Sequence, residues 1–269
     1  MKINVRLYED YWKKSRLKDY QNMLEYAKKN GYEMAGILDF YTMVENGKLS
    51  KDFYDGDKKL LINRHDIDTS PKVARKMFEI EKQVYGKNAS ATYYFRDSTV
   101  DTALIHELEQ YGYETGYHYE NIAKFEKRKK LKNVDKIRQY LPQIRIRFRQ
   151  DLNNFRIKTD SRSLSVASHG DFINVKYSLS NTELLNDPEI RTSSGILVEA
   201  YDEKIMKYVE QRFADHILLG EFADYVKEGI KMGKKCIMIL THPRNWEVDR
   251  KANTRENFVR FFEAVQYKK

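Results

Sequence analysis

The sequence predicts an α/β protein in which mostly parallel strands alternate with helices. Short apolar runs rich in β-forming residues recur along the chain, and most intervals between them have apolar residues at helical spacing. Strands that are separated by helices pair in parallel through right-handed crossovers. The length of 269 residues suits one large domain, since α/β barrels commonly reach this size. Only four prolines occur, and no repeat or Pro/Gly-rich linker divides the chain.

Six strands and five helices follow from this pattern. Strands are expected at residues 59–63, 90–95, 113–117, 164–168, 196–200 and 235–240. Residues 11–30 are predicted to form a helix that ends at Gly31. Four further helices are predicted where apolar residues are three or four positions apart: Val73 to Val84, Leu104 to Tyr111, Ile205 through Val209 to Phe213, and Phe222 to Ile230.

The composition indicates a globular protein with a polar surface. Hydrophobic residues make up 41% of the chain and charged residues 33%, which argues against disorder. The single cysteine, Cys236, lies in an apolar run, so an intramolecular disulfide is excluded and a buried thiol is expected. The first residues lack the apolar region of a secretory signal, and no segment approaches the ~18 apolar residues that span a bilayer. We therefore expect a cytoplasmic location and no transmembrane segment.

The net charge of +9 is concentrated in one segment. Residues 124–149 contain eleven Lys or Arg and two acidic residues. One interpretation is an anion-binding face for nucleic acid, an acidic glycan or a phosphate-bearing substrate. The alternative is a solvated helix, because charge runs usually face water. No zinc-finger spacing or RNA-recognition motif accompanies the charge.

Potentially reactive side chains follow nearly every predicted strand. Asp66 and Asp68 come directly after the first strand of this series, and His118, His169 and His242 follow three others. In a parallel barrel the carboxyl ends of the strands meet at one rim, where barrel active sites lie. The sequence therefore predicts a metal or acid–base site at that rim.

The two aspartates precede a predicted helix. Ser70 can cap this helix with Pro71 in its first position. The positive end of the helix dipole then favours the ionised forms of Asp66 and Asp68. One aspartate can bind a cation while the other faces substrate. A capping loop with solvated aspartates is the alternative.

The histidines have neighbours that suggest their roles. Glu120, two residues after His118, can be a second ligand, a partner that fixes the imidazole tautomer, or a surface charge. A lone histidine after a strand is more often structural than ligating. His169 precedes Gly170, which permits close approach of the backbone.

The last motif combines a proton carrier with possible substrate contacts. His242 follows a fully apolar strand and precedes Pro243, so it leaves the core and can donate or accept a proton. Arg244 can contact an anion, and Trp246 can stack on a sugar face. Simple packing is the alternative for Trp246. His106 and His216 fall within helical patterns and receive no role.

These residues together suit metal-assisted hydrolysis. Asp68, His118 and His169 meet the needs of a zinc-like divalent ion, which binds His and carboxylate ligands and keeps one position open. Such an ion activates water near neutral pH and polarises a carbonyl oxygen. Asp66 as a carboxylate base and His242 as an imidazole acid complete the set for hydrolysis of an amide or ester.

The order of these motifs resembles the polysaccharide deacetylases. The motifs are Asp-x-Asp at 66–68, Gly-Tyr-His-Tyr-Glu at 116–120, Ser-His-Gly at 168–170 and Thr-His-Pro-Arg-x-Trp at 241–246. More narrowly, they resemble a divergent branch of carbohydrate esterase family 4 whose members carry His-Asp-x-Asp and His-Tyr-Glu. The similarity runs from about residue 60 to about residue 247.

This resemblance implies a distorted (β/α) barrel of the polysaccharide-deacetylase type. The chain would form a single domain over residues 1–269, with an N-terminal helical extension at 1–58 and the barrel core at 59–247. The resemblance also implies a divalent cation, usually zinc, and hydrolysis of an N-acetyl amide on a sugar.

The resemblance further assigns roles residue by residue. Asp66 matches the general base, Asp68 the metal-binding carboxylate, and His118 the first metal histidine. His242 matches the histidine that acts as general acid.

This chain departs from the family pattern at two points. The second metal histidine of the family stands four residues after the first, and Ile122 occupies that position here. His169 or Glu120 would supply the missing ligand. The usual pair of adjacent aspartates is separated by Ile67, so Asp66 and Asp68 could exchange their roles.

Three functions follow as hypotheses. The first, which we favour, is a metal-dependent deacetylase of a carbohydrate, such as a phosphate-bearing glycan precursor. The second is a catalytically inactive glycan-binding relative with the same fold. The third is a nucleic-acid binder that uses residues 124–149, and we expect no such partner. The sequence carries no signal for the oligomeric state.

Overall fold

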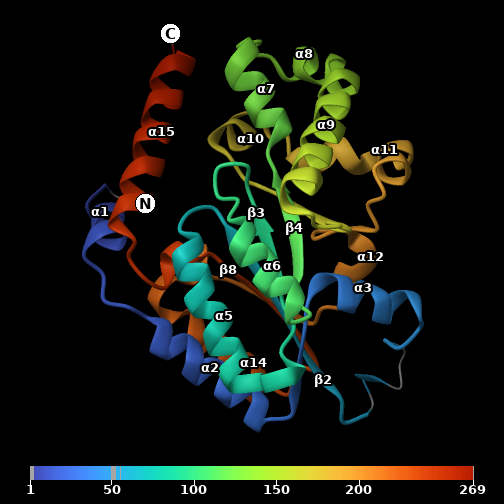
Figure 1. Cartoon of the computed structure of the whole chain (residues 1–269), viewed down its shortest axis with the longest axis vertical. Coiled ribbons are helices and arrows are strands. Elements are labelled where there is room, and N and C mark those ends of the chain that lie inside the picture. Colours follow the sequence, from blue (N-terminus) through green and yellow to red (C-terminus); the bar gives the residue numbers. More distant parts are fainter. Residues whose placement is uncertain (1–2, 50–52, 55, 269) are drawn as a thin grey trace.

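The computed structural model of the chain describes residues 3–49, 53–54 and 56–268 (Figure 1). These residues form one sheet of eight strands in which every pairing is parallel. The strands are β1 (Tyr32–Ala35), β2 (Lys59–Ile67), β3 (Thr92–Phe95), β4 (Glu114–Tyr119), β5 (Ser165–Ser168), β6 (Val198–Glu199), β7 (Gln211–Ala214) and β8 (Cys236–Thr241).

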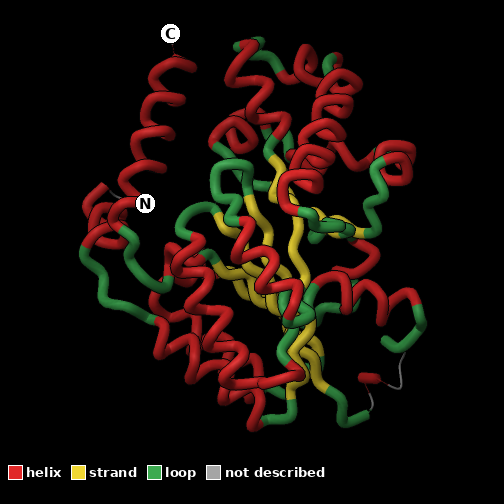
Figure 2. The backbone as a smooth tube through the Cα atoms, viewed as in Figure 1, coloured by secondary structure: helices red, strands yellow, loops and turns green. Residues whose placement is uncertain are grey.

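The sheet curls into half a barrel that helices cover (Figure 2). Its strand order is β6-β5-β4-β3-β2-β8-β7, and β1 also pairs with β2. The helices are α1 (Ile3–Tyr11), α2 (Leu17–Lys29), α3 (Ile37–Glu45), α5 (Pro71–Tyr85), α6 (Thr102–Gln110), α7 (Asn121–Lys129), α8 (Val134–Gln139), α9 (Leu141–Thr159), α10 (Phe172–Tyr177), α11 (Pro188–Ser193), α12 (Glu203–Met206), α13 (Asp215–Leu218), α14 (Phe222–Lys231) and α15 (Arg250–Lys268). Short 3-10 turns are η1 (Gly86–Asn88), η2 (Asn181–Asn186), η3 (Leu219–Glu221) and η4 (Pro243–Asn245).

Strand β2 is the centre of the sheet. Its residues 59–62 pair with β1 and its residues 64–67 with β3, while residues 60–65 pair with β8. Since the β8 pairing overlaps both others along β2, β1 and β3 must share the opposite edge. β2 is buried along almost its whole length, as expected for a strand of a parallel sheet.

Successive side chains of β2 point to opposite faces of the sheet. Asn63 and His65 face α2 and α5, where Tyr20 and Glu81 lie. Arg64 faces the barrel interior, as Asp66 does, and the two form an ion pair. His65 is therefore adjacent to the aspartates in sequence but lies on the other face of the sheet.

A glycine lets the barrel interior pack closely. Gly116 of β4 lies against Tyr94 of β3, and a Cβ at Gly116 would approach the Tyr94 ring to 2.6 Å and the Ser165 carbonyl oxygen to 2.7 Å. Real Cβ atoms do not come this close to other heavy atoms. Any side chain at Gly116 would therefore displace the ring that packs beside Arg64.

The predicted α/β class with parallel strands is confirmed. All six predicted strands are present, displaced by at most a few residues at their ends. Helices α5, α6 and α14 match three of the helical patterns. Cys236 is a buried free thiol, as expected. The structure shows barrel-like curvature with edges at β6 and β7 within the described part of the chain.

One predicted helix is wrong. Ile205, Val209 and Phe213 are spaced like one face of a helix, but α12 ends at Met206 and Phe213 lies in β7. The backbone of β7 pairs with β8, and the Phe213 ring packs against Gly229 of α14. Four residues are too few for an alternating pattern to be recognised, so tertiary pairing overrides the local signal.

The N-terminal region also differs from one continuous helix. Residues 11–30 include the last residue of α1 and all of α2, with a break at residues 12–16. Strand β1, which the sequence did not predict, pairs with β2 and so joins residues 32–35 to the sheet. Within the described residues, no helix combines the length and the apolar composition needed to cross a bilayer.

A buried polar network behind β2 yields the first prediction. The Glu81 carboxyl group accepts hydrogen bonds from Tyr20 (2.5 Å), Asn63 (2.8 Å) and Tyr93 (2.9 Å), and it lies 2.7 Å from His65 Nε2. All five side chains are completely buried.

Glu81→Ala is expected to lower the free energy of unfolding by about 3 kcal/mol or more, because it leaves four buried polar groups without their partner. Denaturant unfolding measures the change. Glu79→Ala, on the exposed side of the same helix, is the control and should cost less than about 0.5 kcal/mol. Equal losses for the two variants would contradict the assigned importance of the network.

Candidate metal centre

Three side chains converge at the carboxyl end of the sheet. Asp68 follows β2, His118 lies in β4, and His169 follows β5. Oδ1 of Asp68 lies 3.5 Å from His118 Nε2 and 3.3 Å from His169 Nε2. One potential ligand atom from each residue lies within 4.8 Å of the others. The predicted convergence of residues from three strands is therefore present in the structure.

The hydrogen bonds of His118 leave its inner nitrogen free for a cation. The Nδ1–H group donates to the carbonyl oxygen of Ala167 at 3.0 Å, so the lone pair lies on Nε2. Ala167 is the β5 partner of His118 in the parallel ladder. The register of the two strands thus fixes the orientation of the imidazole.

Glu120 lies behind His169. Its Oε2 is 3.3 Å from His169 Nδ1, while His169 Nε2 points toward Asp68. Two contacts of 3.1 Å from Arg96 hold the Glu120 carboxylate in place. His169 and Glu120 were the two candidates for the third ligand beside Asp68 and His118. The structure places His169 at the cluster, and Glu120 is placed to orient the His169 imidazole.

The surroundings of Asp68 favour its ionised form and leave one carboxylate oxygen available to a cation. Burial raises the pKa of Asp68, but attraction to His169 and contacts with both histidines lower it well below its usual value. Its Oδ1 is buried and has no hydrogen-bond partner among the described residues. An orphaned carboxylate oxygen beside two imidazole nitrogens matches the donor set of a divalent ion.

Asp66 lies next to this cluster and is held by Arg64. The Arg64 guanidinium donates two hydrogen bonds of 2.8 Å to the Asp66 carboxylate and lies over the rings of Tyr94 and Tyr201. Burial raises the pKa of Asp66, but Arg64 and the nearby His118 outweigh it, and the pKa is lowered. Asp66 Oδ2 is 3.5 Å from His118 Nε2.

His242 lines the same cavity and is paired with a residue that the sequence pattern did not indicate. Asp215, the first residue of α13, lies 2.7 Å from His242 Nδ1 and accepts the backbone N–H of His242. Burial lowers the pKa of His242, but attraction to Asp215 outweighs it and raises the pKa to about 9. The only sequence signal for Asp215 was its position after β7, a strand that was not predicted.

Asp215, His216 and His242 form a second group with close potential ligand atoms. The oxygens of Asp215 already accept hydrogen bonds from His242 and from the Trp246 indole at 3.0 Å. The ring of His216 stands at 90° to that of His242, with centroids 5.5 Å apart. We interpret this group as a positioned imidazole rather than as a second metal site.

The structure corrects the role expected for Trp246. This side chain is 3% exposed and packs against Tyr20 and Phe222, so its ring offers no face to a sugar. Its indole N–H instead fixes Asp215. Arg244 does line the cavity, where its guanidinium pairs with Asp10 of α1.

The cluster opens into a cavity of about 470 Å³. Its walls include Asp66, Asp68, His118, His169 and His242. The first and last helices of the chain complete the walls with Arg6, Glu9 and Asp10 of α1 and with Arg260 of α15. The volume and the mixture of charged groups suit a polar small molecule or one unit of a larger one.

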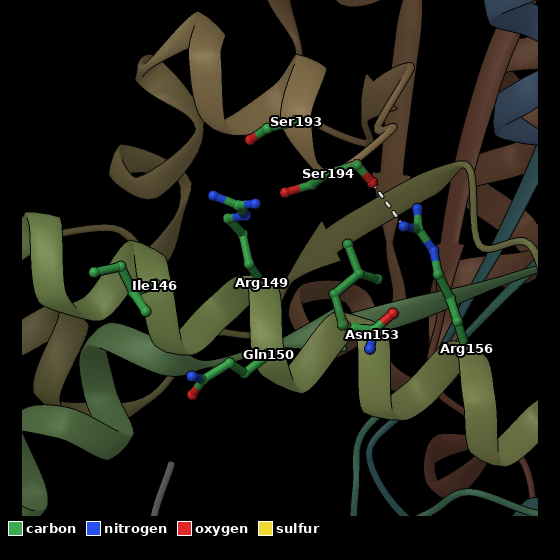
Figure 3. Close-up of a pocket in the computed structure, with 8 residues that line it drawn as sticks. Ile146, Arg149, Gln150, Asn153, Arg156, Ser193 and Ser194 are labelled. Atoms are coloured by element: carbon green, nitrogen blue, oxygen red, sulfur yellow. Dashed lines mark hydrogen bonds between the residues drawn. The ribbon is translucent and has the colours of Figure 1, made fainter.

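The basic segment at 124–149 is not a uniform positive face. Several of its cations are paired with carboxylates: Lys124 with Asp97, Lys127 with Asp171 and Glu263, Arg138 with Glu183, Arg145 with Asp187, and Arg147 with Asp151. Arg149 contributes to a separate cavity between α9 and α11 (Figure 3). Arginines and serines line that cavity, but no carboxylate or imidazole does, so it lacks the groups that bind metals.

Comparison of the chain with protein-family models, curated proteins and solved structures gives no match. The fold and the site show the class of protein: it is an α/β protein with a candidate metal centre at the carboxyl end of a curled parallel sheet.

The arrangement predicts the metal-binding behaviour of a small set of variants. The purified protein should bind about one divalent ion per chain at this site. Asp68→Asn should weaken binding by about 100-fold or more. Glu120→Gln, which acts through His169, should cost about 10-fold to 100-fold. Elemental analysis measures the number of ions bound per chain, and calorimetric titration measures the affinity.

Asp224→Asn is the control, because the Asp224 side chain is 80% exposed on α14 and pairs only with Lys227 among the described residues. Its affinity should equal that of the unaltered protein. Retention of full metal affinity by Asp68→Asn would rule out this cluster as the site.

Proposed function

We propose that this chain is a metal-dependent hydrolase that removes an N-acetyl or similar acyl group from a sugar or glycan precursor. One observation carries the proposal: potential metal ligands and side chains that can transfer protons line the same cavity. A potential ligand set (Asp68, His118, His169) shares one cavity with an ionised carboxylate (Asp66) and an imidazole (His242). A hydrolase of amides needs these components in contact with the same substrate.

Zinc is the ion that this donor set favours, since two imidazole nitrogens and one carboxylate oxygen leave a coordination position open. When bound, the ion would polarise the substrate carbonyl and lower the pKa of water. Asp68, His118 and His169 would hold it.

The protein's own side chains supply the proton transfers. Asp66 stays ionised because Arg64 lowers its pKa, so it can accept a proton from the attacking water. His242 stays protonated near neutral pH because Asp215 raises its pKa to about 9. It can therefore donate a proton to the leaving nitrogen, which would otherwise depart as an unstable anion.

Two observations support a carbohydrate substrate. The motifs around the cavity resemble those of polysaccharide deacetylases in their order along the chain. The cavity presents hydrogen-bonding groups from several elements, as recognition of a polyhydroxylated ligand requires. Arg6 and Arg260 in its wall keep 44% and 37% of their side chains exposed, and they favour a substrate that carries phosphate or carboxylate groups.

Acetate release from a panel of N-acetylated sugars and sugar phosphates tests the activity. Asp66→Asn is expected to lower kcat by about 100-fold or more while about one metal ion per chain is retained, because it removes the base and not a ligand. Tyr225→Phe, on the exposed side of α14, is the control and should leave kcat unchanged. Saccharide binding without acetate release in the unaltered, metal-loaded protein would favour the inactive glycan-binding alternative.

The Asp215–His242 pair predicts a change in pH dependence. If His242 is the acid, activity should fall as pH rises through about 9, where the imidazole loses its proton. Asp215→Asn removes the attraction that raises this pKa, so the alkaline limb should move to lower pH and kcat should decrease. An unchanged alkaline limb in Asp215→Asn would contradict the role of His242 as the acid.

A further inference from the structure

The C-terminal helix α15 has its polar side toward the protein and its apolar side toward solvent. Asn253, Glu256 and Tyr267 are buried on the inner side. Phe258, Phe261 and Phe262 are 59%, 61% and 56% exposed on the outer side. This polarity is the reverse of that of an ordinary surface helix, whose apolar side faces the core.

Helix α1, at the other end of the chain, repeats this arrangement. Tyr8 is half-exposed and Trp12, the residue that follows α1, is 64% exposed, while Asp10 is buried. The two helices pack together (Figure 1), with hydrogen bonds from Arg6 to Asn257 and from Asn253 to the carbonyl oxygen of Asp10. We call their exposed apolar side chains the terminal ridge: Val5, Leu7, Tyr8, Trp12, Phe258, Val259, Phe261, Phe262 and Val265.

The acidic and basic residues of the same two helices differ in their pairing. Each of their acidic residues pairs with a cation of the protein: Glu9 with Lys13 and Arg16, Asp10 with Arg6 and Arg244, Glu256 with Arg96 and Arg260, and Glu263 with Lys127. In contrast, Lys251, Arg255 and Lys268 are exposed, and no acidic side chain among the described residues pairs with them. Lys251 and Arg255 line a pocket that also contains carboxylates, including Asp249. The exposed surface of the two helices therefore combines aromatic rings with cations that form no ion pair among the described residues.

The end of α7 extends this positive surface. Lys127 pairs with Glu263 of α15, and the Tyr267 hydroxyl donates to Glu126, so the two helices are fixed to each other. The exposed Arg128, Lys129 and Lys130 complete the last turn of α7 and its cap.

We propose that the terminal ridge docks on an anionic membrane surface, with the aromatic rings entering the interface and the lysines and arginines contacting phospholipid phosphates. Aromatic side chains favour the boundary between headgroups and acyl chains, and basic residues add attraction to anionic lipids. Burial of the ridge against a second copy of the chain would be less favourable, because an isologous contact brings together two surfaces that both carry Lys251 and Arg255.

Docking would bring the candidate metal centre close to the lipid headgroups. Arg6 of α1 and Arg260 of α15 line the cavity above the cluster. The same two helices would therefore hold the membrane on their outer side and the substrate on their inner side. The docking itself does not depend on the proposed hydrolase activity.

Co-sedimentation with vesicles tests the proposal on the whole chain. The protein should bind vesicles of phosphatidylcholine mixed with phosphatidylglycerol and bind phosphatidylcholine alone much more weakly. Phe258→Ser combined with Phe262→Ser should reduce binding by about tenfold or more, because two interfacial anchors are lost. Ile157→Ser combined with Met232→Ser, which removes two exposed apolar side chains elsewhere, should leave it unchanged.

A second pair of variants tests the charge. Lys251→Glu combined with Arg255→Glu should abolish the preference for anionic vesicles, whereas Lys158→Glu combined with Arg162→Glu should preserve it. Failure of the unaltered protein to bind anionic vesicles would overturn the proposal. So would a dimer in sedimentation equilibrium that the phenylalanine variant converts to monomer while vesicle binding is absent.

Discussion

The two-residue period of β2 is the constraint on which both the stability network and the candidate site depend. Because side chains alternate along the strand, Asn63 and His65 enter the polar network around Glu81, while Arg64 and Asp66 face the barrel interior. Pairing with β1, β3 and β8 fixes the strand from both edges. A slip of one residue would exchange the two sets, placing Arg64 against Glu81 and His65 in the cavity.

The charged side chains of the candidate site are buried, so each needs a partner of opposite charge to remain stable. An isolated ion buried in protein is strongly destabilised, so each charge requires a partner. Arg64 stabilises Asp66, Asp215 stabilises protonated His242, and Arg96 stabilises Glu120. Asp68 is different, since its Oδ1 has no hydrogen-bond partner among the described residues and its Oδ2 lies at 4.0 Å from the partly exposed Arg260. The same reasoning that explains the other pairs therefore identifies Asp68 as the place where a cation would contribute most.

The sequence predicted those parts of the fold and the site that have strong local signals. The long buried strand β2 includes Asp66 near its carboxyl end, and β8 ends directly before His242, so both residues could be recognised. Asp215 could not, because β7 has four residues and its apolar spacing resembles a helix. The burial of Trp246 depends on packing against Tyr20, more than 200 positions away, which no local pattern encodes.

The pairing of β4 with β5 positions both imidazoles of the candidate site. Ile122 is completely buried at the start of α7, where a histidine would have to replace a core side chain. His169 instead reaches the cluster from the neighbouring strand, and its backbone N–H continues the ladder by donating to Tyr119. Two ligands from adjacent strands are positioned by sheet register rather than by one helical turn. Because Ala167 also accepts the Nδ1–H of His118, the β4–β5 pairing orients both imidazoles at once, so a change in this pairing would disturb two ligands together.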